Sequence, residues 1–356
     1  MGIFDEILKD KGTIFQDEIA LDFDYIPKVL KHRENEQKYV ASCITPLLQG
    51  RSGKNLFITG KPGIGKTAAV RWVLRELEQE TSEVHTIYIN CWKTNTAFKI
   101  LNEICQQIGY RFVQNKNTEE LLKDVASIIN KNAAVFVLDE VDKLEEESII
   151  YALLEDIFRK TIILITNEKE FLAKLDSRIK SRLLPETLEF REYNYEELKD
   201  ILEERKRYAF FPNVWDNEAF KLIVDKTFEF GDVRVGLDLM RKSGLIAEEK
   251  SSKKIYGEIV KEAIKKLDTF KLGSSDSLVN EKKKILNLIK SNSGKSIKEL
   301  HEIFKNQLEM PYRTFFRKIK ELEKEKLITT EEASGPGRST LVYYGTKFKN
   351  LKEFEK

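Results

Sequence analysis

Residues 55–67 read NLFITGKPGIGKT, and the rest of the chain can be interpreted outward from this stretch. The run Asn55–Thr59 is short and apolar, as expected for a buried strand, and Ala68–Gln79 repeats its apolar residues at helical spacing. Between them, Gly60–Thr67 fits the pattern G-x-x-x-x-G-K-[ST]. A glycine-rich turn between a strand and a helix lets backbone N–H groups converge on phosphate oxygens. The stretch therefore predicts a phosphate-binding loop, or P-loop.

The residues of this loop divide the work of binding a nucleotide. Gly63, Ile64 and Gly65 would offer backbone N–H groups to the phosphates at the start of a helix. Lys66 would reach the β- and γ-phosphates, and the hydroxyl of Thr67 would ligate Mg²⁺. The sequence thus predicts ATP or ADP, together with Mg²⁺, as cofactors.

The chain around the loop alternates between two kinds of pattern. Further buried strands are predicted at Thr86–Asn90, Val135–Leu138 and Thr161–Thr166, and amphipathic helices at Ala97–Gly109 and Thr118–Asn130. Alternating strands and helices predict an α/β fold with a doubly wound parallel sheet, whose ligands bind at the carboxyl ends of the strands.

Two of these strands end in polar side chains. Val135–Leu138 leads into Asp139, which would organise Mg²⁺ with Thr67, and Glu140, which would accept a proton from the attacking water or orient it. Asn167 follows the next strand and would hydrogen-bond the γ-phosphate or that water. The structural alternatives are a strand end that opens a charged loop and a simple turn asparagine.

Two arginines follow in residues 175–183, LDSRIKSRL. An arginine presented to the nucleotide of a neighbouring subunit can strongly stabilise the transition state of hydrolysis. Arg182 is our candidate for this catalytic role, and Arg178 is the other possibility. Two ordinary surface arginines would give the same pattern.

Composition limits the class of protein. Hydrophobic residues make up 41% and charged residues 34% of 356, which is typical of a soluble, folded chain with two or three domains. No apolar run reaches the roughly 18 residues of a membrane helix, and the N-terminus does not resemble a secretion signal. Cys43, Cys91 and Cys105 form no C-x-x-C pair, which favours reduced thiols. We expect a cytoplasmic protein without a membrane partner.

The second half of the chain predicts two further domains. From Tyr193 to Phe270 the strand signal gives way to successive helical patterns, which predict a small helical domain, and the polar segment 271–280 is the best linker candidate. Three helical patterns then precede two β-prone runs, Leu327–Glu331 and Leu341–Tyr344, which is the plan of a winged helix. The predicted domains are residues 1–192, 193–272 and 281–346.

Charge is distributed unevenly between these parts. Residues 281–356 carry 18 Lys and Arg against 11 Asp and Glu, a net charge of +7, whereas the preceding residues carry 43 against 48, a net charge of −5. A nucleic-acid-binding module would show this asymmetry, although a solvated lysine-rich surface would show it too.

The third helix of a winged helix enters the major groove of duplex DNA, and the wing reaches a neighbouring groove or the backbone. Phe315, Ile319 and Leu322 share one face of this helix and should be core. The predicted DNA-contacting residues are the polar remainder of the helix and one arginine at the wing tip, namely Tyr312, Arg313, Thr314, Arg317, Lys318, Lys320 and Arg338. A winged helix used for protein contacts is the alternative, because the second half of the helix is acidic.

Together these residues resemble the archaeal origin-recognition and cell-division-control initiators, which are AAA+ ATPases with a helical lid and a C-terminal winged helix. The resemblance rests on the P-loop, on residues 139–142 (DEVD), on Asn167 with LDSRIKSRL, and on residues 231–234 (GDVR). It implies that Tyr193 and Arg205 lie at the nucleotide, that Arg33 belongs to the segment covering the adenine, and that Arg234 is a sensor of the γ-phosphate. One departure is Val235, where the family often has a second basic residue.

The resemblance also implies a function. We expect an ATP-dependent initiator that recognises duplex DNA of a replication origin, hydrolyses ATP slowly, and helps to recruit the replicative helicase. Its expected location is the nucleoid, with other initiator subunits as further partners. Two alternatives remain: an AAA+ protein of a mobile element or plasmid that serves its replication or maintenance, and a signalling NTPase with a protein-binding winged helix.

Overall fold

The computed structural model describes residues 13–271, 285–286, 288–305, 311–324, 328–332 and 340–344. The chain divides into two compact units, one ending at Ala263 and the other beginning at Ile264. The first unit contains the predicted α/β domain and nearly all of the predicted helical domain, and the second contains the predicted winged helix. Among the helices described, none is both long and apolar enough to cross a membrane.

A five-stranded parallel sheet with the order β2-β3-β4-β1-β5 forms the centre of the first unit. Its strands are β1 (Leu56–Thr59), β2 (Val84–Asn90), β3 (Ala133–Asp139), β4 (Lys160–Thr166) and β5 (Glu186–Glu189). Four of them confirm the predicted strands. The fifth, β5, was not predicted, because its sequence ETLE carries no apolar run and it pairs only with β1 at the edge of the sheet.

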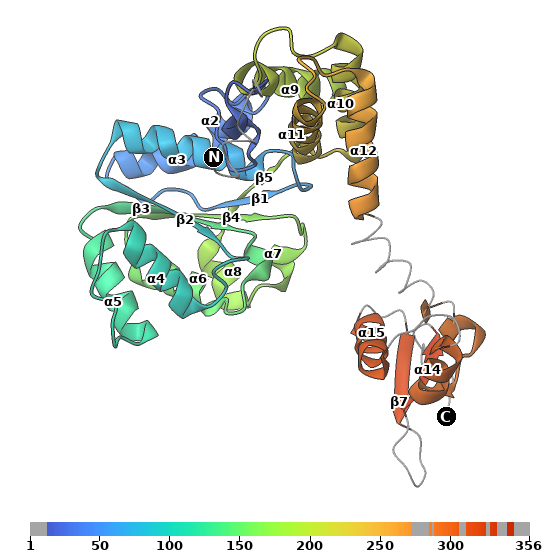
Figure 1. Cartoon of the computed structure of the whole chain (residues 1–356). Coiled ribbons are helices and arrows are strands. Elements are labelled where there is room, and N and C mark those ends of the chain that lie inside the picture. The colour runs from blue at the N-terminus through green and yellow to red at the C-terminus, as the bar shows by residue number, and fades with distance from the viewer. Residues whose placement is uncertain are drawn as a thin grey trace, which may run out of the picture. The chain divides into compact units, whose positions relative to one another are not determined.

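Helices cover both faces of this sheet, with α2 and α3 on one side and α4 to α8 on the other (Figure 1). Their bounds are α2 (Glu34–Leu48), α3 (Lys66–Glu80), α4 (Ala97–Gln107), α5 (Thr118–Ile129), α6 (Ser148–Asp156), α7 (Phe171–Lys174) and α8 (Ser177–Leu183). Because β3 is covered on both faces, all seven of its residues are buried. The short connection between β3 and β4 holds α6 and the 3₁₀ helix η2 (Val141–Lys143).

The parallel strands bring their carboxyl ends to one edge of the sheet. Thr59, just before the P-loop, is paired with Thr166, just before Asn167. Asp139 is paired with Ile165 on the other side of β4. The sheet therefore places the P-loop, Asp139 and Asn167 next to one another, as parallel sheets do with their ligand-binding residues.

Four helices form the predicted helical domain: α9 (Tyr195–Ala209), α10 (Asn217–Phe230), α11 (Val233–Glu249) and α12 (Gly257–Lys271). Asn194 caps α9 in a capping box, and Asp216 and Asp232 accept the first N–H groups of α10 and α11, which sets where these helices begin. The N-terminal segment with η1 (Glu18–Leu21) packs on this domain, since the rings of Phe15 and Phe210 lie 4.8 Å apart.

The second unit has the plan of a winged helix. It contains a helix through residues 288–291, β6 (Lys295–Ser296), α14 (Ile297–Lys305), α15 (Tyr312–Lys324), β7 (Ile328–Glu332) and β8 (Thr340–Tyr344). Strands β6 and β7 pair antiparallel with β8. Phe315, Ile319 and Leu322 are buried in its core as predicted. The predicted linker from residue 272 onward and Arg338 lie outside the described residues.

Candidate functional site

The P-loop between β1 and α3 needs glycine at residues 63 and 65. Gly63 and Gly65 have φ angles of +71° and +89°, in the left-handed region that side chains disfavour. Neither position has room for a Cβ atom, which would lie 1.9 Å from Oδ1 of Asp232 at residue 63 and 2.7 Å from the hydroxyl of Tyr193 at residue 65. The loop is therefore packed against Tyr193 and against Asp232, the N-cap residue of α11.

Lys66 lies at the centre of this site and is only 7% exposed. Its ammonium donates to the carbonyl oxygens of Gly60 and Lys61 and to Oδ1 of Asn167, each at 2.7 Å. Burial lowers the pKa of Lys66 to about 8, against the opposing influence of the Asp139 carboxylate. The sheet thus brings together Lys66 and Asn167, as the sequence predicted, with a cation ready for phosphate oxygens.

Thr67 and Asp139, the two residues predicted to ligate Mg²⁺, contact each other. The hydroxyl of Thr67 donates to Oδ2 of Asp139 at 2.6 Å, and the same oxygen accepts a bond from the hydroxyl of Tyr88 at 2.7 Å. Burial and the neighbouring Asp139 carboxylate raise the pKa of Tyr88, so the phenol remains a donor. A hydroxyl and a carboxylate are hard oxygen ligands, which fit Mg²⁺. Tyr88 was not predicted from the sequence.

Glu140 follows Asp139 in a left-handed backbone conformation, with φ 54° and ψ 43°. Its side chain borders an open hollow of about 380 Å³ that Asn90, Trp92 and Lys93 also line. Burial, and then the carboxylates of Asp139 and Asp142, raise the pKa of Glu140. A carboxylate with a raised pKa accepts a proton more readily, which suits the predicted role toward water.

Arg234 opens α11 beside the P-loop. Its guanidinium binds both carboxylate oxygens of Asp232, at 3.0 Å from Nε to Oδ1 and 2.7 Å from Nη2 to Oδ2. The N–H of Val233 donates to the carbonyl of Gly63 at 3.3 Å, which joins the start of α11 to the loop. Since the side chain of Arg234 is 48% exposed, this arginine has freedom to turn toward a phosphate.

The resemblance assigns Arg33 to the segment that covers the adenine, and in the structure its bonds run to the chain itself. Arg33 is completely buried, and Nε and Nη2 both donate to the carbonyl of Ile64, at 3.1 and 2.9 Å. Nη2 also donates to the carbonyl of Arg191 at 2.6 Å, Nη1 pairs with Glu36, and the guanidinium stacks 3.9 Å from the ring centre of Tyr193. The donors of Arg33 are thus used within the chain, and a direct contact between Arg33 and a nucleotide stays a prediction.

Arg205 also binds the chain. Its guanidinium donates to the carbonyls of Ala20 and Tyr25, at 3.1 and 3.0 Å, and lies over the ring of Tyr25. The residue ties α9 to the N-terminal segment, and a direct contact between Arg205 and a nucleotide stays a prediction. Tyr193, 9% exposed, packs against Gly65 of the P-loop and against the guanidinium of Arg33.

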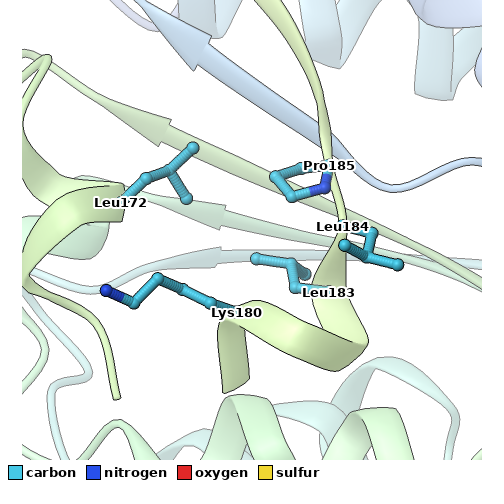
Figure 2. Close-up of a pocket in the computed structure, with 5 residues that line it drawn as sticks. All are labelled: Leu172, Lys180, Leu183, Leu184 and Pro185. Carbon is cyan, nitrogen blue, oxygen red and sulfur yellow. The ribbon is translucent and has the colours of Figure 1, made fainter. Parts of the chain in front are cut away.

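The two candidate arginine fingers differ in their partners. Arg182 pairs with Glu155 and lies over the ring of Tyr151, whereas the side chain of Arg178 is exposed and has no bond among the described residues. A pocket of about 390 Å³ lies beside α8, the helix that holds both arginines. It is lined by Leu172, Lys180, Leu183, Leu184 and Pro185 (Figure 2). Its wall contains none of the predicted site residues, and the ammonium of Lys180 donates to the carbonyl of Ala173, so we do not assign the nucleotide there.

The predicted DNA-contacting face lies on α15. Tyr312, Arg313, Arg317 and Lys320 are exposed and Thr314 is partly buried, which agrees with a surface role. Lys318 is only 4% exposed, so its ammonium is not on that surface, and we leave it out of the interface. The helical spacing already contained this signal, because residue 318 falls three after Phe315 and four before Leu322.

The sheet, the P-loop, the strand-end acids and the helical domain with Arg234 define an AAA+ ATPase with a lid. Family models agree: residues 49–175 match the AAA domain and residues 199–265 match the Cdc6 AAA+ ATPase-type lid domain. The chain is 30% identical to the ORC1-type DNA replication protein 2 of Methanosarcina mazei over 332 residues, 89% of each chain. It is 31% identical to the ORC1-type DNA replication protein 1 of Methanothermobacter thermautotrophicus over 96% of each. The chain belongs to the ORC1-type DNA replication proteins.

Solved structures agree with this assignment. The Aeropyrum pernix ORC1 protein in complex with DNA is similar over 96% of this chain and 95% of its own, with a TM-score of 0.70 and 27% identity. The Cdc6p protein of Pyrobaculum aerophilum shares the fold over 94% of this chain and 95% of its own, with a TM-score of 0.64 and 19% identity. The archaeal initiator resemblance is confirmed.

Proposed function

We propose that this protein is an ATP-dependent initiator that binds duplex DNA of a replication origin and helps to recruit the replicative helicase, together with other initiator subunits. The proposed nucleotide binding is supported above all by one observation: Lys66, Asn167 and the Thr67–Asp139 pair converge at one edge of the sheet. The family assignment supports the replication half. A cytoplasmic location at the nucleoid follows from a role in chromosome replication.

Each site residue has a part in the proposed ATP cycle. The P-loop N–H groups of Gly63, Ile64 and Gly65 and the Lys66 ammonium hold the phosphates, and Thr67 and Asp139 hold Mg²⁺, which neutralises charge on the phosphate oxygens. Glu140 orients the attacking water or accepts its proton, and Asn167 hydrogen-bonds the γ-phosphate or that water.

The lid residue Arg234 is proposed as the sensor of the γ-phosphate. Its partner Asp232 touches Gly63, so a change at the loop would be transmitted to the start of α11. An ATP γ-phosphate would compete with Asp232 for the guanidinium, because both are anionic oxygen groups that suit its fork of donors.

Hydrolysis is proposed to be slow in the isolated chain. An arginine finger contributes about 10³–10⁵ in turnover when a neighbour supplies it. Because Arg182 is paired with Glu155 and Arg178 is exposed without a partner among the described residues, we now favour Arg178 for presentation to another subunit.

The DNA half rests on the winged helix. The exposed residues of α15 with hydroxyl or cationic groups are Tyr312, Arg313, Arg317 and Lys320, and residues 281–356 have a net charge of +7. The Aeropyrum pernix ORC1 relative, 27% identical, has been solved in complex with DNA. Phosphate contacts dominate the affinity of such modules, whereas base contacts give the sequence preference.

A footprint of the purified chain on the repeats beside candidate origins of its own genome, with ATP and with ADP, tests the proposal. We expect protection of the repeats over random duplex at the same salt concentration. The variant Lys66→Ala should lose nucleotide binding and any dependence of the footprint on nucleotide. A chain that binds origin and random duplex equally would contradict origin recognition. A chain that binds neither would favour a protein-binding winged helix.

A further inference from the structure

The carboxylate of Asp139 receives three hydrogen bonds. Oδ1 accepts the N–H of Glu140 at 2.9 Å, and Oδ2 accepts the hydroxyls of Thr67 at 2.6 Å and Tyr88 at 2.7 Å. The first two donors belong to the strand end and the P-loop themselves. Tyr88 is different, because it comes from the neighbouring strand β2 and is not part of either motif.

Tyr88 is itself held from two sides. Strand β2 is an edge strand, and the side chain of Gln107 on α4 bonds the backbone of Tyr88. Oε1 of Gln107 accepts the N–H of Tyr88 at 3.0 Å, and Nε2 donates to the Tyr88 carbonyl at 2.8 Å. The guanidinium of Arg71 lies 5.3 Å from the centre of the phenol ring, and Arg71 in turn pairs with Asp24. Both the backbone and the ring of Tyr88 are therefore fixed before any ligand arrives.

We propose that Tyr88 is a positioning residue for Mg²⁺, acting through Asp139. When a metal takes the Thr67 hydroxyl as a ligand, Oδ2 of Asp139 keeps the Tyr88 hydroxyl as its partner, so the carboxylate stays in the rotamer that faces the P-loop. Partners that orient a ligating carboxylate typically change metal affinity by about 10–100-fold when removed. The inference rests on the proposed Mg²⁺-dependent binding of nucleotide.

The variant Tyr88→Phe in the full chain tests this, because it removes one hydroxyl and keeps the ring. The measurement is the binding of a fluorescent ADP analogue, titrated with Mg²⁺ and repeated in EDTA. We expect the Mg²⁺ concentration for half-maximal enhancement of binding to rise about 10-fold or more, while the affinity in EDTA stays that of the wild type.

A matched control removes the same kind of bond elsewhere. Tyr110 donates to Oδ2 of Asp124 at 3.0 Å, beside α5 and outside the site, so Tyr110→Phe should leave the Mg²⁺ titration unchanged. If Tyr88→Phe does not fold, Gln107→Ala provides a second test. It frees the backbone of Tyr88 without touching the hydroxyl, and we expect a smaller shift in the same direction.

The outcomes separate the inference from the function on which it rests. An unchanged Mg²⁺ titration in a folded Tyr88→Phe, or an equal loss of affinity in EDTA, would overturn the positioning role and leave the metal site intact. A wild-type chain whose nucleotide binding ignores Mg²⁺ would instead overturn the proposed metal site.

Discussion

The nucleotide site and the exposed face of α15 are built in opposite ways. At the nucleotide site, polar side chains hold one another: Lys66 binds Asn167, and Asp139 accepts bonds from Thr67 and Tyr88. On α15, the side chains of Arg313 and Arg317 are exposed and make no hydrogen bond or ion pair with the described residues. The nucleotide site therefore depends on tertiary packing, whereas the face of α15 depends on the charge of a single helix. Substitutions should therefore have large, coupled effects in the first and small, additive effects in the second.

The largest effect is expected at Glu140. Changing Glu140→Gln removes the carboxylate that would accept a proton from water, so ATP turnover should fall by about 10²–10⁴-fold while nucleotide binding is kept. Phosphate release and binding of a fluorescent nucleotide measure the two properties separately. Glu189→Gln, at the carboxyl end of β5 and paired with Lys169, is the matched control and should keep its turnover. Equal turnover in Glu140→Gln and wild type would remove Glu140 from the mechanism.

The second-largest effect is expected at the buried Arg33, which should contribute to the free energy of unfolding. Arg33→Ala leaves Glu36 without its buried partner and the Ile64 carbonyl without two donors, so the free energy of unfolding should fall by about 3–5 kcal/mol. Arg75→Ala is the control, because Arg75 also binds two backbone carbonyls, those of Ile26 and Pro27, but is only partly buried. Urea unfolding of both variants measures the loss in free energy of unfolding. Equal losses in Arg33→Ala and Arg75→Ala would mean that the burial of Arg33 does not increase its contribution to stability.

The sequence predicted the parts of the site that local pattern fixes. Asp139, Asn167 and the P-loop each follow a short apolar run, and the parallel sheet necessarily gathers such strand ends. Tyr88 escaped prediction because an aromatic residue inside a strand has the same pattern whether it packs in the core or donates to a carboxylate. Its role depends on the pairing of β2 with β3, which the sequence does not show.

Arg33 and Arg205 show the other limit of prediction. Arg33 lies beside the P-loop and Arg205 lies on α9, but the direction of a guanidinium depends on which carbonyls the packing leaves within reach. Arg33 finds the carbonyls of Ile64 and Arg191, and Arg205 finds those of Ala20 and Tyr25. Sequence spacing specifies the neighbourhood of such a residue, whereas tertiary structure decides what it contacts.

A smaller effect follows from the lowered pKa of Lys66. With a pKa of about 8 in the structure, the amine is largely neutral at pH 9, and bound phosphates should return it to the charged form. Nucleotide binding should therefore take up close to one proton at pH 9, and affinity should fall by up to about tenfold per pH unit above pH 8. Calorimetry at pH 9 in two buffers of different protonation enthalpy measures the uptake. Lys66→Arg, which keeps its charge, should show none, and a wild-type chain that also takes up no proton would contradict the lowered pKa.

The smallest effect is expected on α15, where two adjacent cations differ in burial. Arg317 is exposed and Lys318 is 4% exposed, so only Arg317 can contact a phosphate or a base edge. Arg317→Ala should lower the slope of log affinity against log salt concentration by about one unit if it contacts phosphate, or cost about 1–3 kcal/mol on specific sites if it pairs with a guanine edge. Lys318→Met keeps most of the buried volume and should leave the salt slope unchanged. Anisotropy titrations of the full chain on origin and random duplexes, at several salt concentrations, distinguish these results.

Equal salt slopes for wild type and Arg317→Ala, with no loss on specific sites, would mean that this face of α15 does not touch DNA. A lower slope for Lys318→Met would mean that the buried lysine turns outward when DNA binds, and that exposure in the free protein does not define the interface.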